Sequence, residues 1–232
     1  MKQSAKITAL YLASAALLLL LAQVFLPLDG LARDAAILAA SGVVLFRLIS
    51  KELARRDRVE RILRVQATHD PLTGLVNRAL FEATLARATA RAARGGHHFG
   101  IAYIDLDGFK TINDRYGHHI GDLLLQEVAS RISSVVRASD CAARFGGDEF
   151  VVLADGPKEF SAYRLADRLR DAFNTPFTAG SLSLPVSASI GVAFYPEHGR
   201  EGVHLLQAAD KAMYVAKAAG KTRAVAALSS AA

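Results

Sequence analysis

Residues 144–150 of this 232-residue chain read Arg-Phe-Gly-Gly-Asp-Glu-Phe. Apolar and β-prone residues lie on both sides of the paired glycines, which predicts strands over residues 141–145 and 150–153 joined by a tight hairpin turn. Gly146 and Gly147 have no Cβ, so a phosphate can approach the backbone of the turn closely. A Gly-Gly turn is also an ordinary structural feature, so the hairpin alone leaves a structural and a nucleotide-binding interpretation open.

A second acidic group lies upstream of the hairpin. Asp105-Leu106-Asp107 closes a very apolar run over residues 99–105, which predicts a buried strand with carboxylates at its end. Carboxylates in such a place are costly unless they are solvated or bound to a cation. Hard oxygen ligands suit Mg²⁺, and Mg²⁺ suits nucleotide phosphates, so the two acidic groups together favour the nucleotide-binding interpretation.

The rest of residues 67–232 alternates between helical and strand patterns. A turn cluster over residues 69–75 marks the start of this region. Helical patterns end near residue 94 and recur over 109–116, 120–136, 158–173 and 201–219, and further strand patterns cover 182–194 and 223–227. Pro185 interrupts the first of these strand patterns. This order predicts an α/β (α+β) sandwich, in which helices cover a mostly antiparallel central sheet.

These motifs resemble the GGDEF family of diguanylate cyclases. Residues 144–150 match the family's signature, and the resemblance extends over residues 67–224. Further segments match in the family's order: 69–75, 105–114, 117–122, 189–193 and 209–217. The resemblance implies a polymerase-palm fold related to the catalytic core of class III adenylyl cyclases. Val76 and Lys221 depart from the family's usual Pro and Arg.

The resemblance also implies which residues hold metal ions. Two Mg²⁺ ions, for which Mn²⁺ is a possible substitute, would be bound by oxygen atoms of Asp105, Leu106 (its backbone carbonyl), Asp148 and Glu149. Asp148 and Glu149 are the implied catalytic residues, with Asp148 as the candidate base.

A further set of residues is implied to bind GTP. Asn113 and Asp122 would bond the guanine, because a carboxylate accepts from N1 and N2 hydrogens that adenine lacks. The residues implied for the phosphates combine positive charge with close backbone approach: Phe109, Lys110, Gly146, Gly147, Lys217 and Lys221.

The implied activity is the condensation of two GTP molecules into cyclic di-GMP with release of pyrophosphate, by a homodimer in which two domains face each other. Arg137 and Asp140 form an Arg-x-x-Asp motif at the spacing where the family binds its product, which implies product inhibition. Two alternatives remain at this point. A degenerate domain would act as a receptor for GTP or cyclic di-GMP, and a related cyclase would make a hybrid dinucleotide.

The N-terminal residues predict a membrane anchor. Residues 7–28 carry no charge, and about 20 apolar residues suffice to span a bilayer. Residues 35–49 form a second apolar run, broken only by Arg47. Basic residues flank both runs, so a transmembrane hairpin over residues 1–49 would have both ends in the cytoplasm, at the inner membrane. A cleaved signal peptide is the alternative for the first run.

A charged segment over residues 50–66 predicts a linker helix between the hairpin and the catalytic domain at 67–232, either solvated or paired with its copy as a coiled coil. Residues 1–66 hold ten Lys and Arg and five Asp and Glu, so they carry five of the six net positive charges. The domain is therefore nearly neutral, which disfavours nucleic-acid binding. Cys141 is the single cysteine, which excludes an internal disulfide and fits a reducing compartment.

Overall fold

The computed structural model describes residues 14, 17, 30–156, 162–219 and 224–227. The chain forms two compact units, Met1–Arg64 and Val65–Ala232. The first unit is described chiefly by the long helix α2, Gly30–Thr68, whose last residues belong to the second unit. Everything else described here belongs to the second unit.

Helix α2 corrects the prediction for the N-terminal segment. The segment that a hairpin would need as a turn between the two apolar runs is helical from Gly30 onward, and the second apolar run continues without a break into the linker. In the described part of the chain, no helix combines the length and the apolar character that crossing a bilayer requires. The uncharged run at 35–46 would rise about 18 Å, short of a hydrocarbon core of about 30 Å. A second span over 35–49 is therefore not supported, and the first predicted span lies almost wholly outside the described residues.

A six-stranded sheet forms the centre of the second unit, in the order β1-β3-β4-β2-β7-β8. The strands have these bounds: β1 Val76–Asn77, β2 Phe99–Leu106, β3 Cys141–Gly146, β4 Glu149–Asp155, β7 Ala188–Tyr195 and β8 Ala224–Ala226. The three inner pairs are antiparallel, whereas β1 and β8 each join the edge of the sheet in parallel. The predicted α/β fold with a mostly antiparallel sheet is thus confirmed as a mixed sheet.

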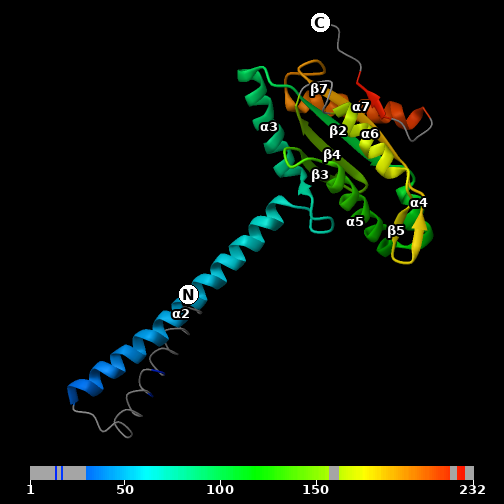
Figure 1. Cartoon of the computed structure of the whole chain (residues 1–232). Helices are drawn as coiled ribbons and strands as arrows, with labels where there is room; N and C mark the ends of the chain where they lie inside the picture. The colour runs from blue at the N-terminus through cyan, green and yellow to red at the C-terminus, as the bar shows by residue number, and fades with distance from the viewer. Residues whose placement is uncertain (1–13, 15–16, 18–29, 157–161, 220–223, 228–232) are drawn as a thin grey trace. The chain divides into compact units, whose positions relative to one another are not determined.

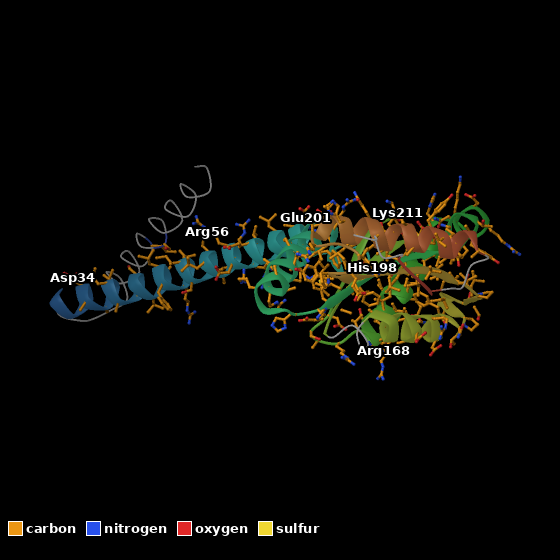
Figure 2. The ribbon with its side chains drawn as sticks, turned by 90° about the horizontal axis from the view of Figure 1, so that it is seen from above. Asp34, Arg56, Arg168, His198, Glu201 and Lys211 are labelled. Atoms are coloured by element: carbon orange, nitrogen blue, oxygen red, sulfur yellow. The ribbon has the colours of Figure 1, made fainter. Side chains whose placement is uncertain are left out.

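Helices cover both faces of the sheet (Figure 1). α3, Arg78–Gly95, and α7, Gly202–Ala218, pack on one face, where their apolar side chains meet Ile101 and Tyr103 of β2. α5, His118–Val135, and α6, Ala162–Phe173, pack on the other face together with the short α4, Phe109–Tyr116, where they meet Ala102 and Ile104. Figure 2 shows Glu201, the residue before α7, and Lys211 of α7 on one side of the sheet, and Arg168 of α6 on the opposite side. β2 is buried along its whole length, because its alternating side chains supply both cores.

Two strand predictions need correction. The run expected over 182–194 is two strands, because Pro185 lacks the N–H that a ladder requires. Its first part, β6 Leu182–Leu184, pairs with β5 Phe177–Ala179 in a separate hairpin, and β7 begins only at Ala188. β1 was not predicted, because two residues are too short to show a periodic pattern. The helix expected from residue 158 is described from Ala162 onward.

Candidate active site

Asp105 lies near the C-terminal end of β2, one of the two central strands of the sheet. Asp105 lies opposite Glu149 of β4 on one side and Ser189 of β7 on the other. It is only 8% exposed. The backbone N–H of Leu106 donates to the carbonyl of Asp148 at 3.3 Å, which ties the strand end to the hairpin turn. The three predicted metal-binding acids therefore come from adjacent positions on β2 and the β3–β4 hairpin.

The turn of the β3–β4 hairpin depends on its glycines and on Arg144. Gly146 and Gly147 have φ values of +150° and +51°, which other residues adopt only with strain. The Arg144 guanidinium donates to the Gly147 carbonyl through Nη2 at 2.8 Å and Nε at 3.1 Å. The same guanidinium donates to Asp70 Oδ1 at 3.1 Å. The turn cluster at the start of the domain thereby braces the hairpin, a link that the sequence patterns did not reveal.

Asp70 is itself held by Thr73. The backbone N–H and the hydroxyl of Thr73 donate to Asp70 Oδ1 at 2.9 and 2.6 Å. Burial alone would raise the pKa of Asp70, but the hydrogen bonds from Thr73 and Arg144 and the Arg144 charge outweigh it, so the pKa lies below its ordinary value. The carboxylate therefore stays ionised and keeps its bond to Arg144 at neutral pH.

Asp107, the second acid of the Asp-x-Asp motif, has hydrogen-bond partners within the protein. Its carboxylate accepts from Ser187 Oγ at 2.7 Å and from Ser189 Oγ at 2.9 Å. Its backbone N–H donates to the Ser187 carbonyl at 2.9 Å. The second acid of the Asp-x-Asp motif thus fastens the end of β2 to the start of β7.

Lys217 of α7 reaches the site because α7 lies very close to β7. A Cβ at Gly191 would collide with the backbone of Ala209 and Met213, so only glycine permits this packing. One helical turn beyond Met213, Lys217 Nζ donates to Asp105 Oδ1 at 2.6 Å. This bond raises the pKa of Lys217, so the ammonium remains charged.

Asp105 and Glu149 both carry raised pKa values. Burial is the main cause for each, and repulsion by Asp148 adds to it. Glu149 is also repelled by Asp105 and by Asp210 of α7, whereas a hydrogen bond with the Tyr103 hydroxyl lowers its pKa in part. Burial, followed by the charges of Glu149 and Asp210, raises the pKa of Tyr103, so the phenol stays protonated. Tyr103 and Asp210 were not predicted as members of the site.

The carboxylates fit a divalent cation of the kind predicted. Among residues 30–156, 162–219 and 224–227, no three His, Cys, Asp or Glu side chains form a ready-made metal cluster. Mg²⁺ does not require one, since it commonly binds one or two carboxylates and completes its shell with substrate phosphates. Asp105 is buried and lies opposite the half-buried Glu149. Burial, together with negative neighbours, raises the pKa of both, so they supply hard oxygen ligands whose repulsion a cation would relieve.

The residues predicted to bind guanine lie on α4 and α5. Asn113 Oδ1 is buried and has no hydrogen-bond partner, an unusual state for a polar atom. The Asn113 amide lies against Gly121, where a Cβ would overlap it, and Asp122 follows as an exposed residue of α5. The unpartnered oxygen of Asn113 therefore lies next to Gly121, the residue before the exposed Asp122.

The residues predicted for the phosphates have different surroundings. Phe109 is 9% exposed and its ring packs in the core, so only its backbone is available to a ligand. Lys110 is exposed on the first turn of α4. Lys221 lies outside the described residues.

Arg137 and Asp140 form the turn between α5 and β3, at the opposite end of β3 from the glycines. Six residues of β3 separate the two ends by about 20 Å. Asp140 already has local partners, since it accepts from the backbone N–H of Arg137 at 2.9 Å and of Asp155 at 3.3 Å. The Arg137 side chain is exposed.

Comparison with known proteins gives a consistent result. Residues 67–223 match the family model described as the GGDEF domain of diguanylate cyclases. The chain is 46% identical over 164 residues to the bifunctional diguanylate cyclase/cyclic di-GMP phosphodiesterase MucR of Pseudomonas aeruginosa, which covers 71% of this chain and 24% of that protein. It is 45% identical over 154 residues to the diguanylate cyclase TpbB of the same species, covering 66% of this chain and 35% of TpbB. The chain thus spans between about a quarter and about a third of the length of these curated relatives.

Solved structures agree with the sequence matches. The structure of a shortened TpbB from Pseudomonas aeruginosa that comprises only the GGDEF domain matches with a TM-score of 0.67 and 41% identity, covering 69% of this chain and 94% of that one. The coiled coil and GGDEF domain of DgcB from Caulobacter crescentus, solved in complex with c-di-GMP, matches with a TM-score of 0.66 and 32% identity, covering 83% and 98%.

Proposed function

The chain belongs to the GGDEF-domain family of diguanylate cyclases, and we propose that it condenses two GTP molecules into one cyclic di-GMP. The observation that carries this proposal is the acidic edge of the sheet, where Asp105 lies opposite Glu149 and is joined through the backbone of Leu106 to Asp148. A turn of two glycines adjoins these acids, so phosphates and carboxylates can share one cation. A receptor that bound only cyclic di-GMP, through Arg137 and Asp140, would have no need of this arrangement.

Asp105, Asp148, Glu149 and the carbonyl of Leu106 would hold Mg²⁺ against the triphosphate. When bound, the metal neutralises charge that develops on the reacting phosphate and lowers the pKa of the attacking hydroxyl. Lys217, already at Asp105, contributes a further positive charge beside the phosphates. The backbone of Gly146 and Gly147 lets the phosphates approach without a steric barrier.

Asn113 and Asp122 would select guanine over adenine. Both offer oxygen acceptors, and guanine has hydrogens on N1 and N2 that can donate to them. A buried acceptor with no partner is costly, and a guanine N–H would relieve that cost at Asn113. Adenine offers no donor at N1, so the acceptor would remain unsatisfied with ATP.

The reaction needs two copies of the domain, each holding one GTP. The 3′-hydroxyl oxygen of one GTP attacks the α-phosphorus of the other, a P–O bond forms, the bond to the β-phosphate oxygen breaks and pyrophosphate leaves. The hydroxyl proton passes to Asp148 or to water beside it, and a second such step closes the ring. Alignment of two nucleotides by a homodimer converts a bimolecular encounter into a step within one complex. Exposed Leu53 and Leu63 on α2 are apolar surface that a second copy would cover.

Product control and membrane attachment complete the proposal. Arg137 has an exposed guanidinium that can bond a guanine edge or a phosphate of cyclic di-GMP. Residues 7–28 carry no charge and would anchor the chain in the inner membrane, and the many basic residues over 47–64 would keep the domain that follows them in the cytoplasm. Carbonate extraction of membranes tests the anchor: the chain should stay in the pellet, and its release would refute the anchor.

The catalytic proposal is tested with the purified full-length chain, GTP and Mg²⁺, with products separated by chromatography. Wild type should form cyclic di-GMP, and Asp148→Ala should form none. Asp171→Ala is a matched control, because Asp171 is an exposed acid on the far α6 and should leave product formation unchanged. A folded, dimeric wild type that binds GTP and leaves it intact would contradict the catalytic proposal and favour the receptor.

A further inference from the structure

A cavity of about 500 Å³ lies between α3 and α7, on the face of the sheet that these two helices cover. Tyr103 and Phe145 line it from the sheet, two residues before Asp105 and one residue before Gly146. Small-molecule sites typically measure about 300–1,000 Å³. The described residues that line this cavity include none that we assign to the metal, GTP or the product. The cavity is therefore large enough for a ligand and is separate from the proposed GTP site.

The apolar part of the lining suits a planar ring. Leu85 of α3 and Leu206 of α7 line the cavity together with Tyr103 and Phe145. The Phe145 ring meets Tyr103 edge to face, with centroids 5.9 Å apart, and meets Phe81 in the same manner at 5.3 Å. Such contacts hold an aromatic ring in one orientation. Proteins commonly bind nucleobases by stacking them on aromatic rings and on Arg guanidinium planes.

The charged part of the lining consists of Arg78 and Glu82 from α3 and Asp210 from α7. Arg78 Nε donates to Glu82 Oε1 at 2.7 Å, and the guanidinium lies 5.2 Å from the Phe145 centroid. This bond uses one of the five N–H donors of the guanidinium, so its two terminal nitrogens can still donate. Asp210 is exposed and makes no hydrogen bond or ion pair with the part of the chain that the structure describes. The cavity therefore offers a ligand both donors and a carboxylate acceptor.

This set of groups matches guanine better than adenine. Guanine presents O6 and N7 as adjacent acceptors, to which an Arg can donate two hydrogen bonds. Its N1 and N2 hydrogens can donate to a carboxylate. Adenine has an amino group in place of O6 and no hydrogen on N1, so it would oppose a donor to Arg78 and offer Asp210 no N1 donor.

We propose that this cavity is a second guanine site, in which Arg78 donates to O6 and N7, Asp210 accepts from N1 and N2, and the base lies against Phe145. The inference rests on the proposed function, since that reaction consumes and produces guanine nucleotides. It assigns no step of the condensation to the cavity.

A single introduced tryptophan can report on the cavity, because the chain has no natural one. Val203 lines the cavity and is 54% exposed, so Val203→Trp puts the reporter at its rim. Titration of this full-length variant with GMP should quench the fluorescence, and AMP should leave it unchanged. Val215→Trp is the matched control, since Val215 is also 54% exposed on α7 but does not line this cavity. GMP should not quench it.

Three substitutions in the Val203→Trp background identify the site. Asp210→Asn and Arg78→Gln should each raise the GMP concentration for half-maximal quenching about tenfold, because each removes a hydrogen bond to a charged group. Asp122→Asn, in the proposed GTP site, should leave this concentration unchanged. Quenching that is lost in Asp122→Asn would overturn the second site, because GMP would then act from the GTP site.

Equilibrium dialysis of wild type with GMP gives a second measurement without the tryptophan. Asp210→Asn should lower the number of GMP molecules bound per chain by one. An unchanged number, absence of quenching by GMP, or equal quenching by AMP would overturn the second guanine site and leave the proposed condensation intact. Absence of cyclic di-GMP from wild type with GTP, together with the expected quenching, would instead refute the proposed function alone.

Discussion

The ion pair between Asp70 of the opening turn and Arg144 of the β3–β4 hairpin leads to a quantitative prediction. Asp70→Asn removes the charge of Asp70 but keeps an oxygen that can accept the three bonds now made to Oδ1 by Thr73 and Arg144. The Arg144 and Asp70 side chains are 12% and 20% exposed, so solvent screens this pair only partly. A bond to a charged group contributes about 1.5–3 kcal/mol and a neutral one about 0.5–1.5 kcal/mol. The variant should therefore lose about 2 kcal/mol of stability at pH 7.

The assay is urea denaturation together with thermal unfolding. A loss of about 2 kcal/mol corresponds to a decrease in Tm of about 4–8 °C for a domain of this size. Asp171→Asn is the matched control, because its 3.7 Å pair with Arg170 is exposed and should contribute about 0–1 kcal/mol. If Asp70→Asn lost no more stability than Asp171→Asn, the brace would have no energetic role.

The pH dependence of the same variant gives a second test. The pKa of Asp70 is lower in the folded chain than its ordinary value of 3.8, so the unfolded chain binds the proton more readily. The stability that the carboxylate contributes is thus fully present above about pH 4–5 and is lost as the pH falls through the folded pKa. The difference between wild type and Asp70→Asn should narrow below pH 4, and an unchanged difference down to about pH 3 would refute the assigned cause.

Three further predictions concern packing, base selection and product control. Gly191→Ala should destabilise the domain by at least about 1–3 kcal/mol in urea denaturation, because the new Cβ meets the backbone of α7. Gly42→Ala, with open space around it on α2, should cause no loss. Asp122→Asn should lower kcat/KM for GTP about tenfold or more and leave the affinity for Mn²⁺ unchanged. Arg137→Ala should raise the inhibition constant of cyclic di-GMP about 10–100-fold in a rate assay with added product, while the initial rate stays the same.

Each of these three predictions would be contradicted by a specific result. Gly191→Ala with wild-type stability would mean that α7 can shift without cost. An unchanged kcat/KM in Asp122→Asn would remove Asp122 from guanine recognition. Inhibition of Arg137→Ala at the wild-type concentration of product would separate the Arg-x-x-Asp motif from control.

Local sequence patterns predict those parts of the fold and the site whose structure depends only on residues that are close together in the chain. The apolar run that ends at Asp105 and the Gly146–Gly147 turn both give strands whose ends meet, because antiparallel pairing aligns them. Pro185 correctly predicts a break in the strand pattern over residues 182–194, but the sequence does not show that the residues before it belong to a separate hairpin. That outcome depends on which strand the segment pairs with, and pairing is a tertiary property.

Contacts between distant segments were beyond the reach of local patterns. Asp70 and Arg144 are 74 residues apart in the chain. Tyr103 lies near Glu149 only because of the register in which β2 pairs with β4. The Asp-x-Asp motif suggested two acids at one site, yet Asp107 is bound by the serines of the segment leading into β7. In each case the decisive partner comes from another strand. The one signal that could have placed Tyr103 near Glu149 is the register of β2 against β4.

If this site joins two GTP molecules, the reaction has a fixed stoichiometry that can be measured. Phosphorus NMR of the purified full-length chain with GTP and Mg²⁺ follows substrate, pyrophosphate and the cyclic dinucleotide in one sample. Wild type should consume two GTP for each cyclic di-GMP formed and release two pyrophosphates, and Asp148→Ala should show none of these changes. GDP and inorganic phosphate as the products, or bound GTP that persists unchanged with a folded dimer, would contradict this expectation.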